Sequence, residues 1–143
     1  MEEQRFFVGV KAIFLNDSNE ILVLETNPRH TDLVVELHWD LPGGRVKGKD
    51  SIEDTLKREV EEELGIKRFR IKGLFDACIS KMSPHGKDGT SLALITFLCE
   101  MNEKGLELSD EHTGFKWAEI DEARKLLRVK FPEGFLQKLE SLR

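Results

Sequence analysis

The sequence predicts an α+β or α/β/α layered domain, and three observations lead to this prediction. Stretches rich in β-forming residues lie before and after one strongly marked central helix, and two helical patterns close the chain. The chain has 143 residues, of which 39% are hydrophobic and 34% charged, enough apolar material for one core. We therefore expect a single domain that covers residues 1–143.

Strands and turns alternate ahead of the helix. In order, the pattern predicts a strand at 6–15 (FFVGVKAIFL), a turn at 16–20 (NDSNE) and a hairpin partner at 21–25 (ILVLE). An irregular connection follows at 27–38, with a short strand at 33–37 (LVVEL). The next segment, WDLPGGRV, requires a tight turn because it contains a proline and two adjacent glycines.

The clearest helix covers 51–65, where Ser51 suits the N-cap, Asp54 follows three residues later and Gly65 suits the C′ position. After it the sequence predicts a long strand at 68–80 with a bend at Gly73, and a buried strand at 91–101 that pairs with it as a long-looped hairpin. A short strand at 115–120 and helices at 121–127 and 131–143 complete the chain.

Composition narrows the range of partners and the cell compartment. The formal net charge is −5, from 22 basic and 27 acidic residues, so binding to long nucleic acid is not favoured. The start, MEEQRFF, lacks the features of a signal peptide, and the longest apolar run is too short to span a membrane. Two cysteines, Cys78 and Cys99, make no disulfide framework. We expect a cytoplasmic enzyme or binding protein.

The helix concentrates negative charge in REVEEELGI, where four glutamates stand between positions 59 and 63. At 100° per residue, Glu59, Glu62 and Glu63 share an arc of about 100°, beside an apolar stripe. Glu61 points about 160° away from Glu59, towards solvent. The three carboxylates therefore border the buried face of the helix, where unpaired charge is costly.

Divalent cations would relieve the repulsion among these carboxylates. Mg²⁺ and Mn²⁺ prefer oxygen ligands, and residues at i, i+3 and i+4 of a helix can converge on one or two ions. A backbone carbonyl from the preceding glycine turn could add a ligand. From the acidic cluster alone, a solvated charged helix face remains the alternative.

The segment 44–66 (GRVKGKDSIEDTLKREVEEELGI) resembles the Nudix box. Eight positions match at the family's spacing: Gly44, Arg58, Glu59, Val60, Glu62, Glu63, Gly65 and Ile66. The upstream WDLPGG is similar to the family's usual lead-in. The first glutamate of the box is Asp50 here, and the resemblance implies that Asp50 pairs with Arg58 to brace the loop against the helix, with a shorter reach.

The resemblance to the Nudix family, on its MutT-like side, implies a fold and an activity. The fold would be a mixed β-sheet sandwiched between helices. Glu59, Glu62, Glu63 and the Gly44 carbonyl would hold Mg²⁺ or Mn²⁺, and the reaction would hydrolyse the pyrophosphate linkage of a nucleoside diphosphate-linked compound. Candidate substrates are (deoxy)nucleoside triphosphates, including oxidised ones, and nucleotide sugars such as ADP-ribose. Family members often form homodimers.

Several roles stay open at this point. The general base could be Glu59 or Glu62 of the box, or Glu111, which lies where some MutT-like members supply a further acid. Trp39, Arg29 and Lys81 are candidates for substrate contacts, with structural packing or a solvated loop as the alternative for each. The rival function is a non-catalytic Nudix-fold module that binds a nucleotide or regulates a partner.

Overall fold

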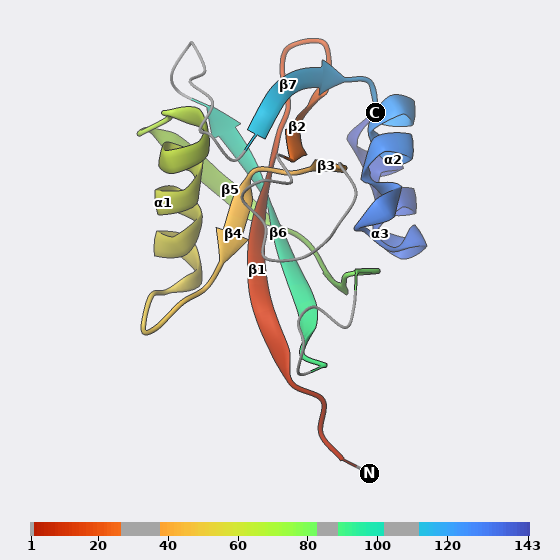
Figure 1. Cartoon of the computed structure of the whole chain (residues 1–143). Helices are drawn as coiled ribbons and strands as arrows, with labels where there is room; N and C mark the ends of the chain where they lie inside the picture. Colours follow the sequence, from red (N-terminus) through yellow and green to blue (C-terminus); the bar gives the residue numbers. More distant parts are fainter. Residues whose placement is uncertain (1, 27–37, 83–88, 102–111) are drawn as a thin grey trace.

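Two β-sheets form the centre of the protein, with one helix on one side and two helices on the other (Figure 1). This description comes from a computed structural model, which describes residues 2–26, 38–82, 89–101 and 112–143. The predicted α+β architecture with a mixed sheet between helices is confirmed. The predicted strand at 33–37 lies outside the described residues.

The larger sheet has the strand order β4-β1-β6-β5. Its members are β1 (Phe6–Phe14), β4 (Gly43–Arg45), β5 (Phe69–Ile79) and β6 (Ser91–Met101). β1 runs parallel to β6 and antiparallel to β4, so the sheet is mixed. The predicted hairpin between β5 and β6 is confirmed, and the register of β5 shifts between Ile71 and Gly73, at the predicted bend.

The smaller sheet has the order β3-β2-β7, from β2 (Ile21–Thr26), β3 (Trp39–Asp40) and β7 (His112–Ala118). The prediction that 21–25 pairs with 6–15 as a hairpin was therefore wrong. A single bridge next to the turn, between Leu15 and Ile21, joins the two segments. Both edges of β1 are occupied by β4 and β6, and β2 is apolar on both faces. Strand β2 therefore pairs with β3 and β7 in the second sheet, where both of its faces are covered.

Helix α1 (Ile52–Leu64) has the predicted ends. The side chain of Ser51 accepts a hydrogen bond from the Asp54 amide, and Gly65 ends the helix in a left-handed conformation at φ 69°. Apolar residues spaced by four, Leu56, Val60 and Leu64, are fully buried against β1. This packing fixes which flank of α1 faces β4.

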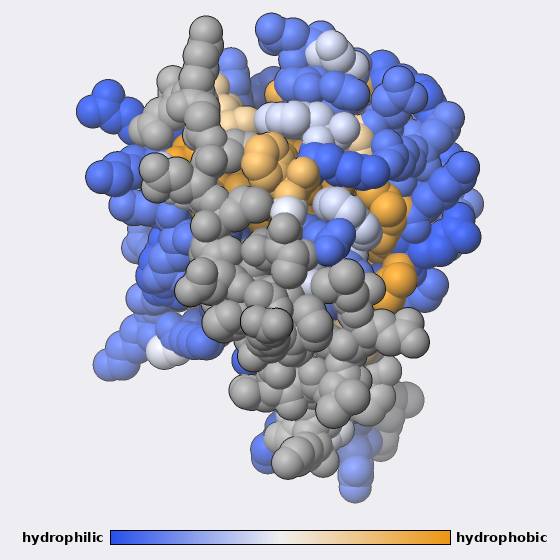
Figure 2. Space-filling view, turned by 45° about the horizontal axis from the view of Figure 1, so that its top comes forward, coloured by the Kyte–Doolittle hydropathy of each residue, from blue (hydrophilic) through white to orange (hydrophobic). Residues whose placement is uncertain are grey.

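The other layer contains α2 (Ile120–Leu126), the 3₁₀ turn η2 (Leu127–Val129), α3 (Glu133–Lys138) and the 3₁₀ turn η3 (Leu139–Leu142). Phe131 and Phe135 stack with ring centroids 4.3 Å apart and join a core that includes Ile13 and Leu94. No helix in the described ranges combines the length and the apolar character needed to cross a bilayer. Figure 2 shows mainly hydrophilic residues on the side of α2 and α3, with hydrophobic residues gathered in the middle of the face.

Candidate active site

The turn after β3 brings a strained glycine into the larger sheet. Gly43 has φ +145°, and a Cβ at this position would lie 1.9 Å from the carbonyl oxygen of Val10. Only glycine fits this close approach between β4 and β1. The WDLPGG segment thereby places two consecutive backbone units, Gly43 and Gly44, directly beside the acidic flank of α1.

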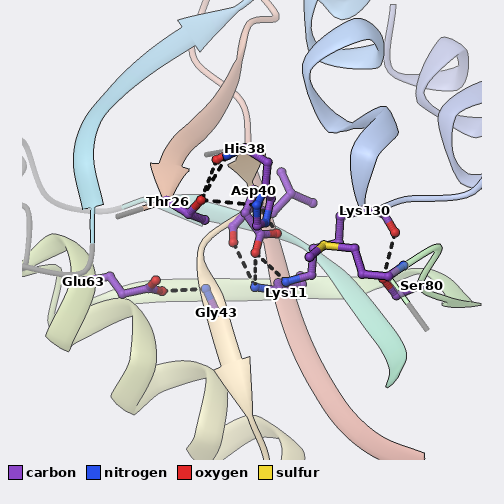
Figure 3. A network of polar contacts seen from close by, with 10 residues as sticks. Lys11, Thr26, His38, Asp40, Gly43, Glu63, Ser80 and Lys130 are labelled. Atoms are coloured by element: carbon purple, nitrogen blue, oxygen red, sulfur yellow. Dashed lines mark hydrogen bonds and ion pairs between the residues drawn. The ribbon is translucent and has the colours of Figure 1, made fainter. Parts of the chain in front are cut away.

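Two of the predicted carboxylates lie at this turn. Glu63 is buried, and its Oε1 accepts a hydrogen bond from the Gly43 amide at 2.6 Å (Figure 3). Glu59 is seated on Gly44, where an added Cβ would come within 2.3 Å of its Cδ atom. Gly44 therefore leaves room for the carboxylate of Glu59, and both side chains reach the turn from successive levels of one helix.

The remaining box acids are more exposed. Glu62 lies on the surface of α1, one turn from Glu59, and Glu61 is exposed as well. Arg58 donates a hydrogen bond to Asp50, and its Nη2 lies 3.7 Å from Glu59 Oε1. Arg58 thus links Asp50, in the loop before α1, to the carboxylate of Glu59.

Burial dominates the electrostatics of Glu63. It raises the pKa of this carboxyl to about 8, against the opposing effects of Lys11 and the Gly43 amide. Glu59 adds a like charge that raises the pKa of Glu63 further. A carboxylate in this position is most stable when a cation lies beside it.

A second charged group is buried next to this site, and the sequence analysis missed it. Lys11 of β1 and Lys130 after η2 both contact Oδ2 of Asp40, at 3.0 and 2.6 Å. Lys11 also donates to the carbonyl of Leu41 at 3.3 Å. A lysine in the middle of the apolar segment GVKAIF was the available signal, because such a lysine needs a buried partner.

The two lysines share one aspartate, yet their pKa values shift in opposite directions. Burial lowers the pKa of Lys130 to about 8, and the carboxylate of Asp40 offsets this only in part. Burial also opposes the charge of Lys11, but Asp40 and Glu63 together outweigh it and raise its pKa. Despite its own burial, Asp40 has a pKa held well below its usual range by the two lysines. Lys11 thus connects the charged group to Glu63.

The structure describes only some of the other candidates. Arg29 and Glu111 lie outside the described residues. Trp39 is half-buried against the core, with Lys116 Nζ 5.4 Å from the ring centroid. Lys81 is exposed, and its Nζ donates to the Arg128 carbonyl at 2.9 Å, on the side of η2. Roles for these residues in substrate binding stay predictions.

The donor set at the turn fits a hard divalent cation. In the described ranges, no group of three or more His, Cys, Asp or Glu side chains is arranged to hold a metal ion. The oxygen atoms that adjoin the turn are nevertheless those that such a cation prefers, from Glu59, Glu63 and the backbone of Gly44. Glu62 is exposed on the same helix and can rotate towards them without disturbing the core.

A carboxylate-lined helix packed on a glycine turn offers oxygen ligands for a divalent cation, which suits an enzyme that hydrolyses phosphoanhydrides. The sequence model of the NUDIX domain matches residues 5–139. The chain therefore belongs to the Nudix family, as the box predicted, and it is a Nudix pyrophosphohydrolase. Members of this family generally use divalent metal ions.

Individual relatives agree with this assignment. An 8-oxo-dGTP diphosphatase of Buchnera aphidicola subsp. Schizaphis graminum is 31% identical over 99 residues, which cover 69% of this chain and 68% of the relative. The asymmetrical bis(5'-nucleosyl)-tetraphosphatase of Sus scrofa is 28% identical over 102 residues, 70% of this chain and 68% of the relative. The crystal structure of a MutT protein from Methanosarcina mazei Go1 superposes with a TM-score of 0.76 at 22% identity, covering 99% and 96% of the two chains, which shows a shared fold.

Proposed function

We propose that the protein hydrolyses the pyrophosphate linkage of a (deoxy)nucleoside triphosphate, oxidised forms included, with Mg²⁺ or Mn²⁺ at the acidic flank of α1. The observation that carries the proposal is the seating of Glu59 on Gly44, beside the buried Glu63. The similarity to an 8-oxo-dGTP diphosphatase supports the substrate class. Glu59, Glu62, Glu63 and the Gly44 carbonyl would hold the cation.

A bound divalent cation neutralises phosphate charge and lowers the pKa of a water molecule. The chain supplies the other requirements. Gly43 fixes Glu63 through its amide, and the close fit at Gly44 fixes Glu59. A carboxylate oriented in this way can accept the proton of the attacking water. The attack of the water on one phosphorus atom then expels the other phosphate group.

The general base is proposed to be Glu59 or Glu62. Glu59 is positioned more firmly, since its side chain is only 15% exposed and rests on the glycine turn. Glu62 is exposed and has more freedom to exchange a proton with solvent. Glu111 stays a third candidate. A comparison of the Glu59→Gln and Glu62→Gln pH profiles would separate the two box residues.

The wider setting is also part of the proposal. We propose a single catalytic domain that acts in the cytoplasm on a small nucleotide and on neither long nucleic acid nor membrane. The net charge of −5 supports a small substrate held locally, and the free thiols of Cys78 and Cys99 suit a reducing compartment. Arg29, Trp39 and Lys81 are proposed substrate contacts.

A nucleotide panel tests the proposal. Purified protein is incubated with dGTP, 8-oxo-dGTP, diadenosine tetraphosphate and ADP-ribose, each with Mg²⁺, with Mn²⁺ or with EDTA, and the products are separated. We expect cation-dependent release of pyrophosphate or phosphate, with triphosphates preferred over ADP-ribose. Turnover of no compound, with nucleotide binding retained, would favour the non-catalytic module.

A further inference from the structure

The chain crosses from the smaller sheet to the larger one between β3 and β4, over a connection that consists of Leu41 and Pro42. Asp40 is the last residue of β3, and Gly43, the first residue of β4, donates its amide to Glu63. Proline has a fixed φ, which leaves this connection few free rotations. The position of Asp40 therefore largely determines the position of the glycine turn.

The carboxylate of Asp40 is held at this crossing by contacts from three parts of the fold. Its Oδ1 accepts a hydrogen bond from the Leu41 amide at 2.7 Å. Its Oδ2 accepts one from Lys11 of β1 and one from Lys130 of the C-terminal layer. The two lysine side chains are only 7% and 11% exposed. Buried charge-assisted hydrogen bonds are short and directional, so they fix the orientation of this carboxylate.

Lys130 is fixed by its main chain as well as by its side chain. Its carbonyl accepts a hydrogen bond from Ser80 Oγ, just after β5, at 2.9 Å (Figure 3). The Lys81 amide donates to the same carbonyl, also at 2.9 Å, and the next residue, Phe131, is fully buried. The ammonium group of Lys130 thus links the C-terminal layer and the end of β5 to the crossing at Asp40.

The stability of the fold does not account for the charge of Lys130. Burial lowers the pKa of Lys130 to about 8, from an ordinary value of 10.5, because Asp40 offsets the burial only in part. A base whose pKa falls on folding is favoured by the folded state in its neutral form, so below about pH 8 the ammonium lowers the free energy of unfolding. Lys11 alone would neutralise Asp40. Ionisable groups that are perturbed in this way are concentrated at functional sites.

We propose that Lys130 is a positioning residue for the hydrolysis proposed above: through Asp40 it fixes the crossing that carries Gly43 and Gly44 and thereby the placement of Glu63 and Glu59 at the turn. The inference rests on the proposed function for its effect on rate. Its effect on the turn is independent of that function, because the hydrogen bond from Gly43 to Glu63 exists without metal or substrate.

Three variants test this role. Lys130→Met keeps the length of the side chain, removes the ammonium and leaves Asp40 paired with Lys11. Lys130→Arg restores a cation that can donate to the same carboxylate. The matched control is Lys138→Met, the same change in the same layer, because Lys138 Nζ lies 3.6 Å from a different aspartate, Asp76.

The first measurement follows the Gly43 amide by NMR in metal-free, ¹⁵N-labelled protein, together with urea unfolding. In Lys130→Met the Gly43 resonance should shift and its hydrogen exchange should quicken at least about tenfold. The unfolding midpoint should stay the same or rise, since a buried charge has been removed. Lys130→Arg should return the resonance towards its wild-type position, and Lys138→Met should leave it unchanged.

The second measurement is steady-state turnover of the triphosphate at saturating Mg²⁺. Lys130→Met should lower kcat about tenfold with KM within about twofold of wild type. Lys130→Arg should recover most of this loss, and Lys138→Met should behave like the wild type.

Three results would overturn the proposal. An unchanged Gly43 resonance in Lys130→Met would show that the turn does not depend on Lys130. A lower unfolding midpoint would assign Lys130 a structural role, and a higher KM with unchanged kcat would mean that it contacts the nucleotide instead. Absence of turnover in the wild type would refute the proposed function, while the Gly43 amide would still decide whether Lys130 positions the turn.

Discussion

The Gly44→Ala substitution tests the geometry of the site at a single point. The added Cβ would lie 2.3 Å from Cδ of Glu59 and 2.7 Å from its Oε1. Ordinary van der Waals contact begins at 3.4 Å, so the carboxylate of Glu59 must retreat by about 1 Å. The backbone of Gly44 needs no unusual conformation, which means that the strain falls on this one side chain.

A displacement of this size has different effects on rate and stability. Misplacing a catalytic or metal-binding group by about 1 Å can lower the rate roughly 100-fold, which equals about 2.7 kcal/mol of transition-state stabilisation. The free energy of unfolding should change by less than about 1 kcal/mol, because the side chain that moves is flexible and partly exposed. The assay pairs kcat/KM for a triphosphate at saturating Mg²⁺ with chemical unfolding.

Gly43→Ala is the matched control, one residue away. Its Cβ would meet backbone, 1.9 Å from the Val10 carbonyl oxygen, at a φ that side chains rarely adopt. This variant should lose several kcal/mol of stability, about 3 or more. The reasoning is refuted if Gly44→Ala keeps kcat/KM within about twofold of wild type, or if it unfolds as readily as Gly43→Ala.

Three further predictions concern stability. Glu63 has an ordinary pKa of 4.5 and a folded-state pKa of about 8, so its contribution to stability without metal is complete below about pH 4.5 and is lost as the pH rises towards 8. Unfolding midpoints of the wild type in EDTA should therefore fall over this range, whereas Glu63→Gln should show a shallower slope. Asp40→Ala leaves Lys11 and Lys130 buried without their shared carboxylate and should cost about 3–5 kcal/mol in urea unfolding; a loss under about 1 kcal/mol would contradict the charge assignment. Ser51→Ala removes the N-cap of α1 and should cost about 1 kcal/mol by the same assay, and an unchanged midpoint would argue against the cap.

Local signals were sufficient to predict α1 and its position in the site. Ser51 and Gly65 mark the ends of the helix by their own conformational preferences, and the fourfold spacing of its apolar residues fixes the buried stripe. The orientation of the glutamates follows from 100° per residue. Glu63 is buried and Glu61 exposed, as that geometry predicts, although Glu62 is more exposed than its place in the arc suggested.

Contacts between distant segments were not predictable in the same way. Lys130 meets Asp40 across 90 residues of sequence, and no local pattern connects them. Likewise, the turn at 16–20 predicts a hairpin between its flanking strands. In the structure, however, β4 and β6 pair with the two edges of β1, so β2 pairs elsewhere. Pairing of this kind depends on the whole sheet rather than on the turn.

The most direct test of the central claim is Mg²⁺-dependent turnover of a nucleoside triphosphate by four single glutamine variants of the acidic helix. We predict that Glu59→Gln, Glu62→Gln and Glu63→Gln stay folded and lose at least about 100-fold in kcat. Glu61→Gln, with the same change on the exposed side of α1, should turn over like the wild type. Full activity in Glu59→Gln or Glu63→Gln, or in the presence of EDTA, would contradict a cation site at the Gly43–Gly44 turn.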